Sequence, residues 1–246
     1  MAVSKNTTTL PNKHQKELEK ISQKLTSQLG DNLYSLMLYG SAVRGNFHPK
    51  TSDINILLIL NTSNPDTHLV IAEIIRHAKV LIEPFVISRI GMERSFKAFA
   101  VKFDSIARNH SILAGEDPFI THKIDSEMTW FLCEQALRNL RLRSVQALIH
   151  WQNKPRRYLQ FLENIVPQLM VDLSEALRIR DIELEHSFEA RIPTIAKHYG
   201  FEPHMLATLL NTKNHHGLLK RIDVEYCHRS LFQLLDCAIN WMTDNE

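Results

Sequence analysis

Glycine, cysteine and excess charge of either sign are scarce in this sequence. Its 246 residues include seven glycines and three cysteines, and the formal net charge is +2. Because Cys133, Cys227 and Cys237 are odd in number and lack metal-ligand spacing, we expect reduced thiols rather than a disulfide framework. A net charge this small gives no basic field of the kind that is typical of nucleic-acid binding.

Long apolar runs are absent as well. The N-terminus has no signal-peptide apolar region, and no run reaches the length that crosses a membrane. Together with the reduced thiols, these absences predict a cytoplasmic protein with no membrane partner. The apolar fraction of 44% and the charged fraction of 23% are ordinary for a globular protein. A chain of this length can hold one large domain or two small ones.

The composition changes near residue 123. Only two glycines, Gly200 and Gly217, follow that point, and strand-like runs give way to helical periodicity. We therefore predict a disordered polar tail over residues 1–12, a domain of strands and helices over residues 13–122, and a helical bundle over residues 123–246. The predicted fold class is α+β, in which a small mixed sheet with helices is followed by an all-α bundle.

Hydrophobic periodicity places the elements within these domains. Short, mostly apolar runs bounded by turn residues predict strands over residues 33–39, 54–60, 79–88 and 110–114. Apolar residues at helical spacing predict helices over residues 14–29, 67–78 and 96–106 of the first domain. In the second domain they predict helices near residues 126–151, 158–179, 187–199, 203–210 and 224–242. The second of these contains Pro167, where we expect a kink or a restart.

Residues 36 to 60 contain the main candidate site. An apolar run ends at Gly40 and Ser41, eleven mostly polar or turn-forming residues follow, and a second apolar run begins directly behind Asp53. Glycine lets the backbone approach a ligand closely, and the Ser41 hydroxyl beside freed backbone amides suits phosphate oxygens. Asp53 and Asn55 are two apart on a strand, so their side chains point to the same face. Oxygen ligands beside a phosphate-binding turn predict a magnesium–nucleotide site.

This pattern resembles the nucleotidyltransferase superfamily, which includes DNA polymerase beta, kanamycin nucleotidyltransferase and the minimal nucleotidyltransferases. The family pattern is Gly-Ser, a gap, and then Asp, an apolar residue and Asp or Glu. Gly40, Ser41, the gap and Asp53 match it, whereas Asn55 stands where the family has its second carboxylate. The segment Leu-Ala-Gly-Glu-Asp-Pro-Phe over residues 113–119 looks like the segment that closes the catalytic domain in bacterial nucleotidyltransferase-like proteins. The later helices resemble the C-terminal domain of kanamycin nucleotidyltransferase and related HEPN-type bundles.

The resemblance implies a metal-dependent catalytic site. Its catalytic and metal-binding positions are Asp53, Asn55 and Glu83, which would hold Mg²⁺ or Mn²⁺, with a nucleoside triphosphate as substrate. Glu83 is the only acidic residue in the third predicted strand, where the family has its third carboxylate. Beside Pro84 it also fits an edge-strand glutamate with no metal role. Asn55 offers a carbonyl oxygen without charge, so we expect a weaker metal site and slow, altered or absent transfer.

The implied nucleotide-binding positions lie in the turn after the first strand. They are Gly40, Ser41 and Arg44. Gly40 and Ser41 would hold the phosphates, and Arg44 would neutralise a phosphate oxygen. Arg44 also fits a solvated turn residue, and the sequence leaves both interpretations open.

Three functions are compatible with the sequence. The first is a nucleotidyltransferase that acts on an unknown small-molecule or macromolecular acceptor through a hydroxyl group. The second is a catalytically degenerate module for nucleotide binding, sensing or interaction. The third is a HEPN-type ribonuclease, whose loose signature fits three pairs: Arg143 with His150, Arg180 with His186, and Arg221 with His228. With thirteen histidines in the chain, these matches carry little weight. A homodimer and the preferred base are left open.

Overall fold

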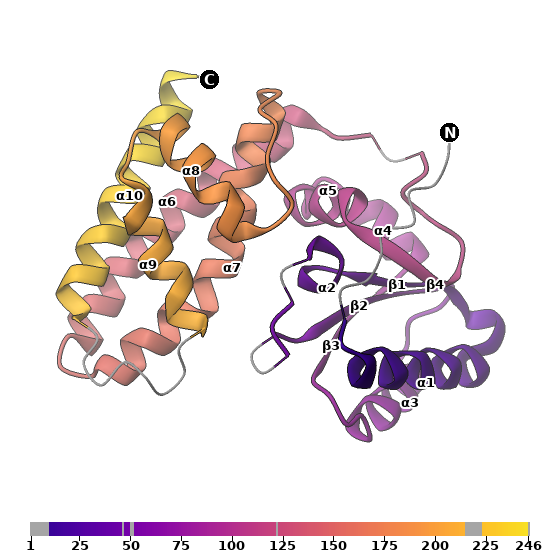
Figure 1. Ribbon diagram of the computed structural model, residues 1–246. Coiled ribbons are helices and arrows are strands. Elements are labelled where there is room, and N and C mark those ends of the chain that lie inside the picture. The colour runs from indigo at the N-terminus through magenta and orange to yellow at the C-terminus, as the bar shows by residue number, and fades with distance from the viewer. Residues whose placement is uncertain (1–9, 46, 50–51, 122, 215–222, 246) are drawn as a thin grey trace. The chain divides into compact units, whose positions relative to one another are not determined.

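The computed structural model describes residues 10–45, 47–49, 52–121, 123–214 and 223–245 (Figure 1). The chain divides into two compact units, Met1–Ile124 and Asp125–Glu246. The boundary predicted between residues 122 and 123 lies two residues before this division. Among the described residues, no helix combines the length and the apolar character needed to cross a membrane.

The first unit, in its described residues, is a four-stranded sheet between helices. Its elements are α1 (Asn12–Leu29), a 3-10 turn (Gly30–Asn32), β1 (Leu33–Tyr39), α2 (Ser41–Arg44), β2 (Ile54–Leu60), α3 (Pro65–Arg76), β3 (Ile82–Ser88), α4 (Arg89–Ser95), α5 (Ala100–Arg108) and β4 (His110–Gly115). The strands lie in the order β3-β2-β1-β4. Because β2 and β3 are parallel and the other neighbours antiparallel, the predicted mixed sheet is confirmed.

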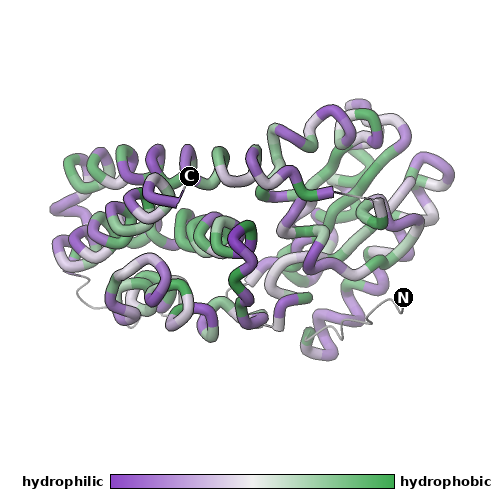
Figure 2. The backbone as a smooth tube through the Cα atoms, turned by 90° about the horizontal axis from the view of Figure 1, so that it is seen from above, coloured by the Kyte–Doolittle hydropathy of each residue, from purple (hydrophilic) through white to green (hydrophobic). Residues whose placement is uncertain are grey.

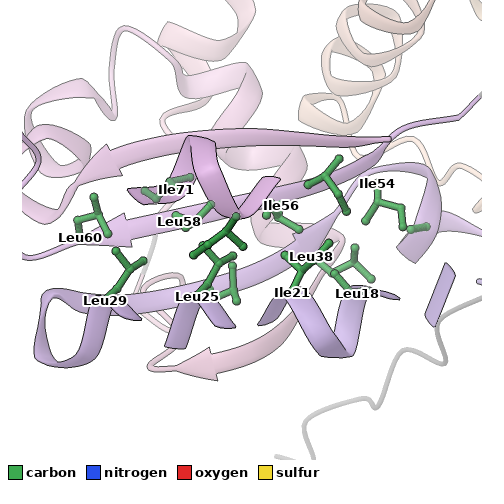
Figure 3. Close-up of a cluster of buried hydrophobic side chains, with 14 of the residues drawn as sticks. Leu18, Ile21, Leu25, Leu29, Leu38, Ile54, Ile56, Leu58, Leu60 and Ile71 are labelled. Atoms are coloured by element: carbon green, nitrogen blue, oxygen red, sulfur yellow. The ribbon is translucent and has the colours of Figure 1, made fainter. Parts of the chain in front are cut away.

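Helices cover both faces of this sheet, with α1 and α3 on one side and α4 and α5 on the other (Figure 1). Leu18, Ile21 and Leu25 of α1 point toward alternate residues of the strands (Figure 3). The residues between them, such as Met37 and Leu57, pack on the opposite face against α4 and α5. Burial on both faces explains why β1 and β2 are almost continuous apolar runs in the sequence. In Figure 2 the strands are mostly hydrophobic, whereas the helices alternate between hydrophilic and hydrophobic turns.

The predicted disordered tail extended too far into the chain. Leu10 is only 7% exposed and belongs to the core cluster between the sheet and α1. Pro11 precedes α1 directly, and its carbonyl oxygen accepts hydrogen bonds from the first turn of that helix. Residues 10–12 are therefore part of the folded unit. The rest of the predicted tail, residues 1–9, lies outside the described residues.

The second unit is helical throughout its described residues. Its helices are α6 (Ser126–Trp151), α7 (Pro155–Ile179), α8 (Phe188–Tyr199), α9 (Pro203–Asn214) and α10 (Val224–Asp244). Aspartate and serine side chains cap α6, α8 and α10 by accepting hydrogen bonds from backbone amides of the first turn. Gly200 ends α8 in the left-handed conformation that a glycine adopts without strain. The predicted α+β class, a mixed sheet with helices followed by an all-α bundle, is confirmed.

The helix does not restart at Pro167, whereas a kink there stays a prediction. Helix α7 runs from Pro155 to Ile179 with Pro167 inside it. Proline removes one backbone hydrogen bond from a helix interior. Its neighbours Val166 and Leu169 are fully buried in the bundle. The packing of this apolar stripe on both sides of the proline therefore holds the helix together through the missing bond.

Candidate nucleotide-binding site

Three of the strands bring their polar residues into one row across the sheet. Asn55 of β2 is in register with Tyr39 of β1 and with Glu83 of β3. Residues in register on neighbouring strands have side chains on the same face. The next row on that face consists of apolar core residues, among them Leu57 and Phe85. The polar row therefore lies at the end of the face that α4 and α5 cover.

The Gly40 turn packs directly against this row. Gly40 has φ +80°, a conformation that residues with a side chain rarely adopt. A Cβ built on Gly40 would come within 3.1 Å of the Asn55 Nδ2 atom. Glycine is thus required both by the backbone conformation and by the closeness of Asn55. The two halves of the sequence motif, separated by eleven residues, meet at this contact.

Asp53 and Asn55 flank the buried Ile54 at the start of β2. Both polar residues are half-buried, whereas Ile54 is fully buried in the core. The Asn55 Nδ2 group donates a hydrogen bond of 3.4 Å to the Asp53 backbone oxygen. This bond engages the amide nitrogen, so the carbonyl oxygen is the atom of Asn55 that remains for a cation.

Glu83 occupies an edge of the sheet, as its neighbour Pro84 indicates. Strand β3 has β2 on one side only, and the Glu83 side chain is exposed. Glu83 lies both on an edge strand and in register with Asn55. The geometry is therefore compatible with a metal-binding carboxylate and with an edge-strand glutamate that has no metal role. What the structure adds is proximity, because a residue 28 positions after Asn55 in the chain becomes its direct cross-strand neighbour.

The residue types of this row suit a hard cation, with fewer charges than the family pattern. Carboxylate and amide oxygens are the ligands that Mg²⁺ prefers in proteins. Asp53 and Glu83 carry two carboxylates, and Asn55 carries a neutral oxygen. Among the described residues, no group of three or more histidine, cysteine, aspartate or glutamate side chains is placed to hold a metal ion. The metal site at this row therefore stays a prediction, and it would need the oxygen of Asn55 and ligands from a substrate.

Tyr39 is a member of the row that the sequence pattern did not single out. Burial, assisted by the negative charge of Glu83, raises the pKa of the Tyr39 phenol to about 12, while Arg44 opposes this rise. Glu83 and Arg44 therefore both lie within electrostatic reach of one hydroxyl group. The signal for Tyr39 in the sequence is its position immediately before Gly40, at the end of an apolar strand.

Lys102 of α5 is a second residue that sequence analysis missed. Its Nζ atom lies 3.8 Å from the centre of the Phe85 ring, two residues beyond Glu83 on the same strand face. Burial lowers the pKa of Lys102, and the charge of Glu83 partly offsets this effect. In the sequence, Lys102 precedes the apolar Phe103 within a helical stripe, and nothing in that pattern relates it to Glu83.

His110 continues the row onto β4 but has no free ring nitrogen. It is in register with Tyr39. Its Nδ1 donates to the Ile106 carbonyl oxygen at 3.0 Å, and its Nε2 lies 3.2 Å from the Asp117 carboxylate. Asp117 in turn accepts a hydrogen bond from the backbone amide of Phe119, which packs in the core. These contacts anchor the segment after β4, so His110 is a structural residue rather than an acid or base.

The structure places only some residues of the arginine–histidine pairs of the ribonuclease signature, and the ribonuclease function stays a prediction. Arg143 and His150 are exposed on α6, where the His150 Nδ1 donates to a backbone oxygen of its own helix. The Arg180 guanidinium lies over the Trp130 ring at 4.2 Å. Arg221 lies outside the described residues.

Comparison with known proteins supports the same fold. No family model and no curated protein matches the chain. Among solved structures, the chain is similar to the spectinomycin adenyltransferase AAD(9) from Enterococcus faecialis, crystallised with ATP and spectinomycin. The TM-score is 0.59, and the alignment covers 93% of this chain and 99% of that chain. The chain has a nucleotidyltransferase fold.

The likeness extends through both units of the nucleotidyltransferase fold, since 93% of the chain is aligned. The sequences are 12% identical, so the comparison establishes the fold and leaves the reaction to the residues of the site. On this fold the polar row lies at the start of β2, next to the Gly40 turn. The departure at Asn55 is therefore a departure in the centre of the candidate site.

Proposed function

We propose that this protein binds a magnesium–nucleoside triphosphate and transfers its nucleotidyl group to a hydroxyl acceptor. The observation that carries this proposal is the contact between Gly40 and Asn55, with Glu83 in register beside them. It unites a turn suited to phosphates with three oxygen ligands at one end of a sheet face. The likeness to a protein crystallised with ATP supports the same substrate class.

Each residue of the site has a specific part in this reaction. Gly40 and Ser41 hold the phosphates, and Arg44 neutralises a phosphate oxygen. Asp53, Asn55 and Glu83 would hold Mg²⁺ or Mn²⁺ through their oxygen atoms, and the metal would supply positive charge that offsets the charge of the phosphates.

The chemistry is an in-line displacement at the α-phosphorus of the nucleotide. The acceptor oxygen bonds to this phosphorus while the bond to the α–β bridging oxygen breaks. Pyrophosphate leaves, and the hydroxyl proton passes to water. The protein contributes by holding the triphosphate and the acceptor in line.

The neutral side chain of Asn55 makes slow transfer our expectation. Replacing a carboxylate by an amide keeps an oxygen ligand and removes one negative charge from the metal site. A bound cation would therefore lose its attraction to one negative charge a few ångströms away. At an effective dielectric constant of about 20, such an attraction amounts to several kcal/mol. If the loss of this charge abolishes catalysis, the same site serves a nucleotide-binding or sensing module, which is our second candidate.

A small hydroxylated molecule is the acceptor class that we favour. The similar protein of known structure was crystallised with spectinomycin, a small molecule, as well as with ATP. The small net charge of +2 gives no support for a nucleic-acid acceptor.

The proposal is tested by exchanging the ligand positions. We expect Asn55→Asp to increase the thermal stabilisation that Mg²⁺ with a nucleoside triphosphate produces, because the metal gains a charged ligand. Without metal, two neighbouring carboxylates repel and should lower the melting temperature slightly. Asp53→Ala should remove the metal dependence in the parent and in the Asn55→Asp background. The measurement is thermal unfolding of the four proteins, with labelled nucleotides followed in parallel for pyrophosphate release.

Two outcomes separate the candidates. If metal raises the melting temperature of the parent strongly and pyrophosphate is released, the result supports an active transferase. Nucleotide binding without pyrophosphate release supports the sensing module. If metal raises the melting temperatures of the parent and of Asn55→Asp equally, residue 55 is not a ligand position. The transferase proposal would then lose its main support.

A further inference from the structure

Lys102 places a positive charge next to the candidate site without an ionic partner. Its Nζ atom lies over the Phe85 ring, one row away from Glu83 on the same sheet face. Within the described part of the chain, no carboxylate forms an ion pair with this ammonium group, and Glu83 acts on it only at longer range. Lys102 is an exposed residue by area, yet its ammonium group is withdrawn onto the ring, where burial lowers its pKa.

A purely structural role explains only part of this arrangement. Lysine stems commonly cover apolar surface while the ammonium group reaches water, and cation–π contacts with phenylalanine are ordinary. Here the ammonium group itself is the part that lies on the ring. An anion would complete the environment of a cation that has no carboxylate partner in the described part of the chain.

The charge of the whole site points to an anionic ligand. Asp53 and Glu83 contribute two negative charges, and Arg44 and Lys102 contribute two positive charges. A site with three carboxylates and no cation repels phosphate groups unless metal ions are bound first. This site is balanced even without metal, because Asn55 is neutral and Lys102 lies one row away from Glu83 on the same sheet face.

We propose that the Lys102 ammonium group binds a phosphate-type oxyanion of a substrate at this site and thereby selects substrates that carry such a group. This inference rests on the proposed function of the site. A lysine acts on phosphate as a compact point charge with three hydrogen-bond donors, so one phosphate-type group suffices. The chemistry has two sources, the triphosphate of the nucleotide or an anionic group on the acceptor.

The experiment compares two lysines of the same region. Lys102→Met removes the charge and keeps most of the stem on Phe85, Lys102→Arg keeps the charge, and Lys97→Met is the matched control at an exposed position. The first measurement is calorimetric titration of each protein with α,β-methylene ATP and Mg²⁺, which binds without transfer. The second titrates inorganic phosphate into each protein saturated with that analogue. Circular dichroism verifies that every variant folds.

We expect Lys102→Met to weaken the binding of either the ATP analogue or inorganic phosphate at least tenfold, as the loss of one charge-assisted hydrogen bond does. Lys102→Arg should stay within about threefold of the parent, since the charge remains, and Lys97→Met should not change either affinity. Weaker binding of the analogue assigns the oxyanion to the nucleotide. Weaker binding of phosphate, with the analogue unaffected, assigns it to the acceptor.

Unchanged affinities of Lys102→Met in both titrations would overturn this inference while leaving the proposed function intact. An equal loss in Lys97→Met would also overturn it, because the effect would then follow net charge rather than position. A parent protein that binds none of the α,β-methylene analogues of the four nucleoside triphosphates would overturn the proposed function and the inference together.

Discussion

A buried aspartate in the helical unit should make the stability of this protein depend on pH. Asp172 of α7 is 4% exposed, and its carboxylate accepts a hydrogen bond of 2.8 Å from Gln168 Nε2. Burial, with the neighbouring Glu175 carboxylate as a further cause, raises the pKa of Asp172 to about 7, although the Gln168 bond opposes the rise. Glu175 itself is engaged by Arg178 at 2.7 Å. The Arg178 guanidinium therefore compensates the charge of Glu175 and not that of Asp172.

The size and the sign of the effect follow from the two pKa values. An ordinary aspartate has a pKa of 3.8, and the raised value of Asp172 means that the folded protein holds the proton more tightly than the unfolded chain. Protonation therefore stabilises the fold fully below about pH 4, and this stability is lost as the pH rises to about 7. At 1.36 kcal/mol for each pH unit, the loss is roughly 4 kcal/mol, an order-of-magnitude figure.

Asp172→Asn should remove this dependence. Asparagine keeps the Oδ1 acceptor for Gln168 and cannot ionise, so the variant should match the parent near pH 4 and exceed it by up to roughly 4 kcal/mol at pH 8. The measurement is urea unfolding followed by the helical circular dichroism signal between pH 4 and pH 8. Glu202→Gln, at an exposed position of the same unit, is the control and should leave the pH dependence unchanged. A constant difference between Asp172→Asn and the parent across this range would refute the reasoning.

Two further substitutions, one in each unit and each with a control, test the local geometry. Gly40→Ala should lower the free energy of unfolding by about 1–2 kcal/mol from backbone strain, and more from the contact with Asn55; Gly30→Ala, where nothing lies within 4 Å, isolates the strain alone. Similar melting temperatures for the two glycine variants would contradict the close contact. Arg191→Met should cost at least about 2 kcal/mol, because its buried guanidinium group donates to two loop carbonyl oxygens and a serine hydroxyl. The exposed Arg229→Met should cost less than about 0.5 kcal/mol, and equal losses in chemical denaturation would show that the buried hydrogen bonds are unimportant.

Local patterns were sufficient for most of the elements. The strand over residues 33–39 and the helix over residues 126–151 have the bounds that periodicity predicts, since burial of a whole face imposes a repeat that can be recognised in the sequence. Predictions made from single residues were weaker. Pro167 lies within a continuous helix, and Leu10 belongs to the core, because packing against other elements outweighs the preference of one residue or its polar neighbours.

The site divides in the same way. The pairing of Gly40 and Ser41 with Asp53 and the neutral residue at position 55 could be identified from spacing alone, because both halves of the motif lie close in the chain. Lys102 could not, because its relation to the site arises only where α5 packs over β3.

The sequence alone determined the α+β class and the neutral character of residue 55, since these depend on local periodicity and on residue type. Only the tertiary structure decided that Glu83 is the cross-strand neighbour of Asn55 and that Lys102 brings a charge to the same face. It also decided that Asp172 has a pKa near 7. These properties depend on strand register and on burial, which arise from contacts between residues far apart in the chain and have no local signature.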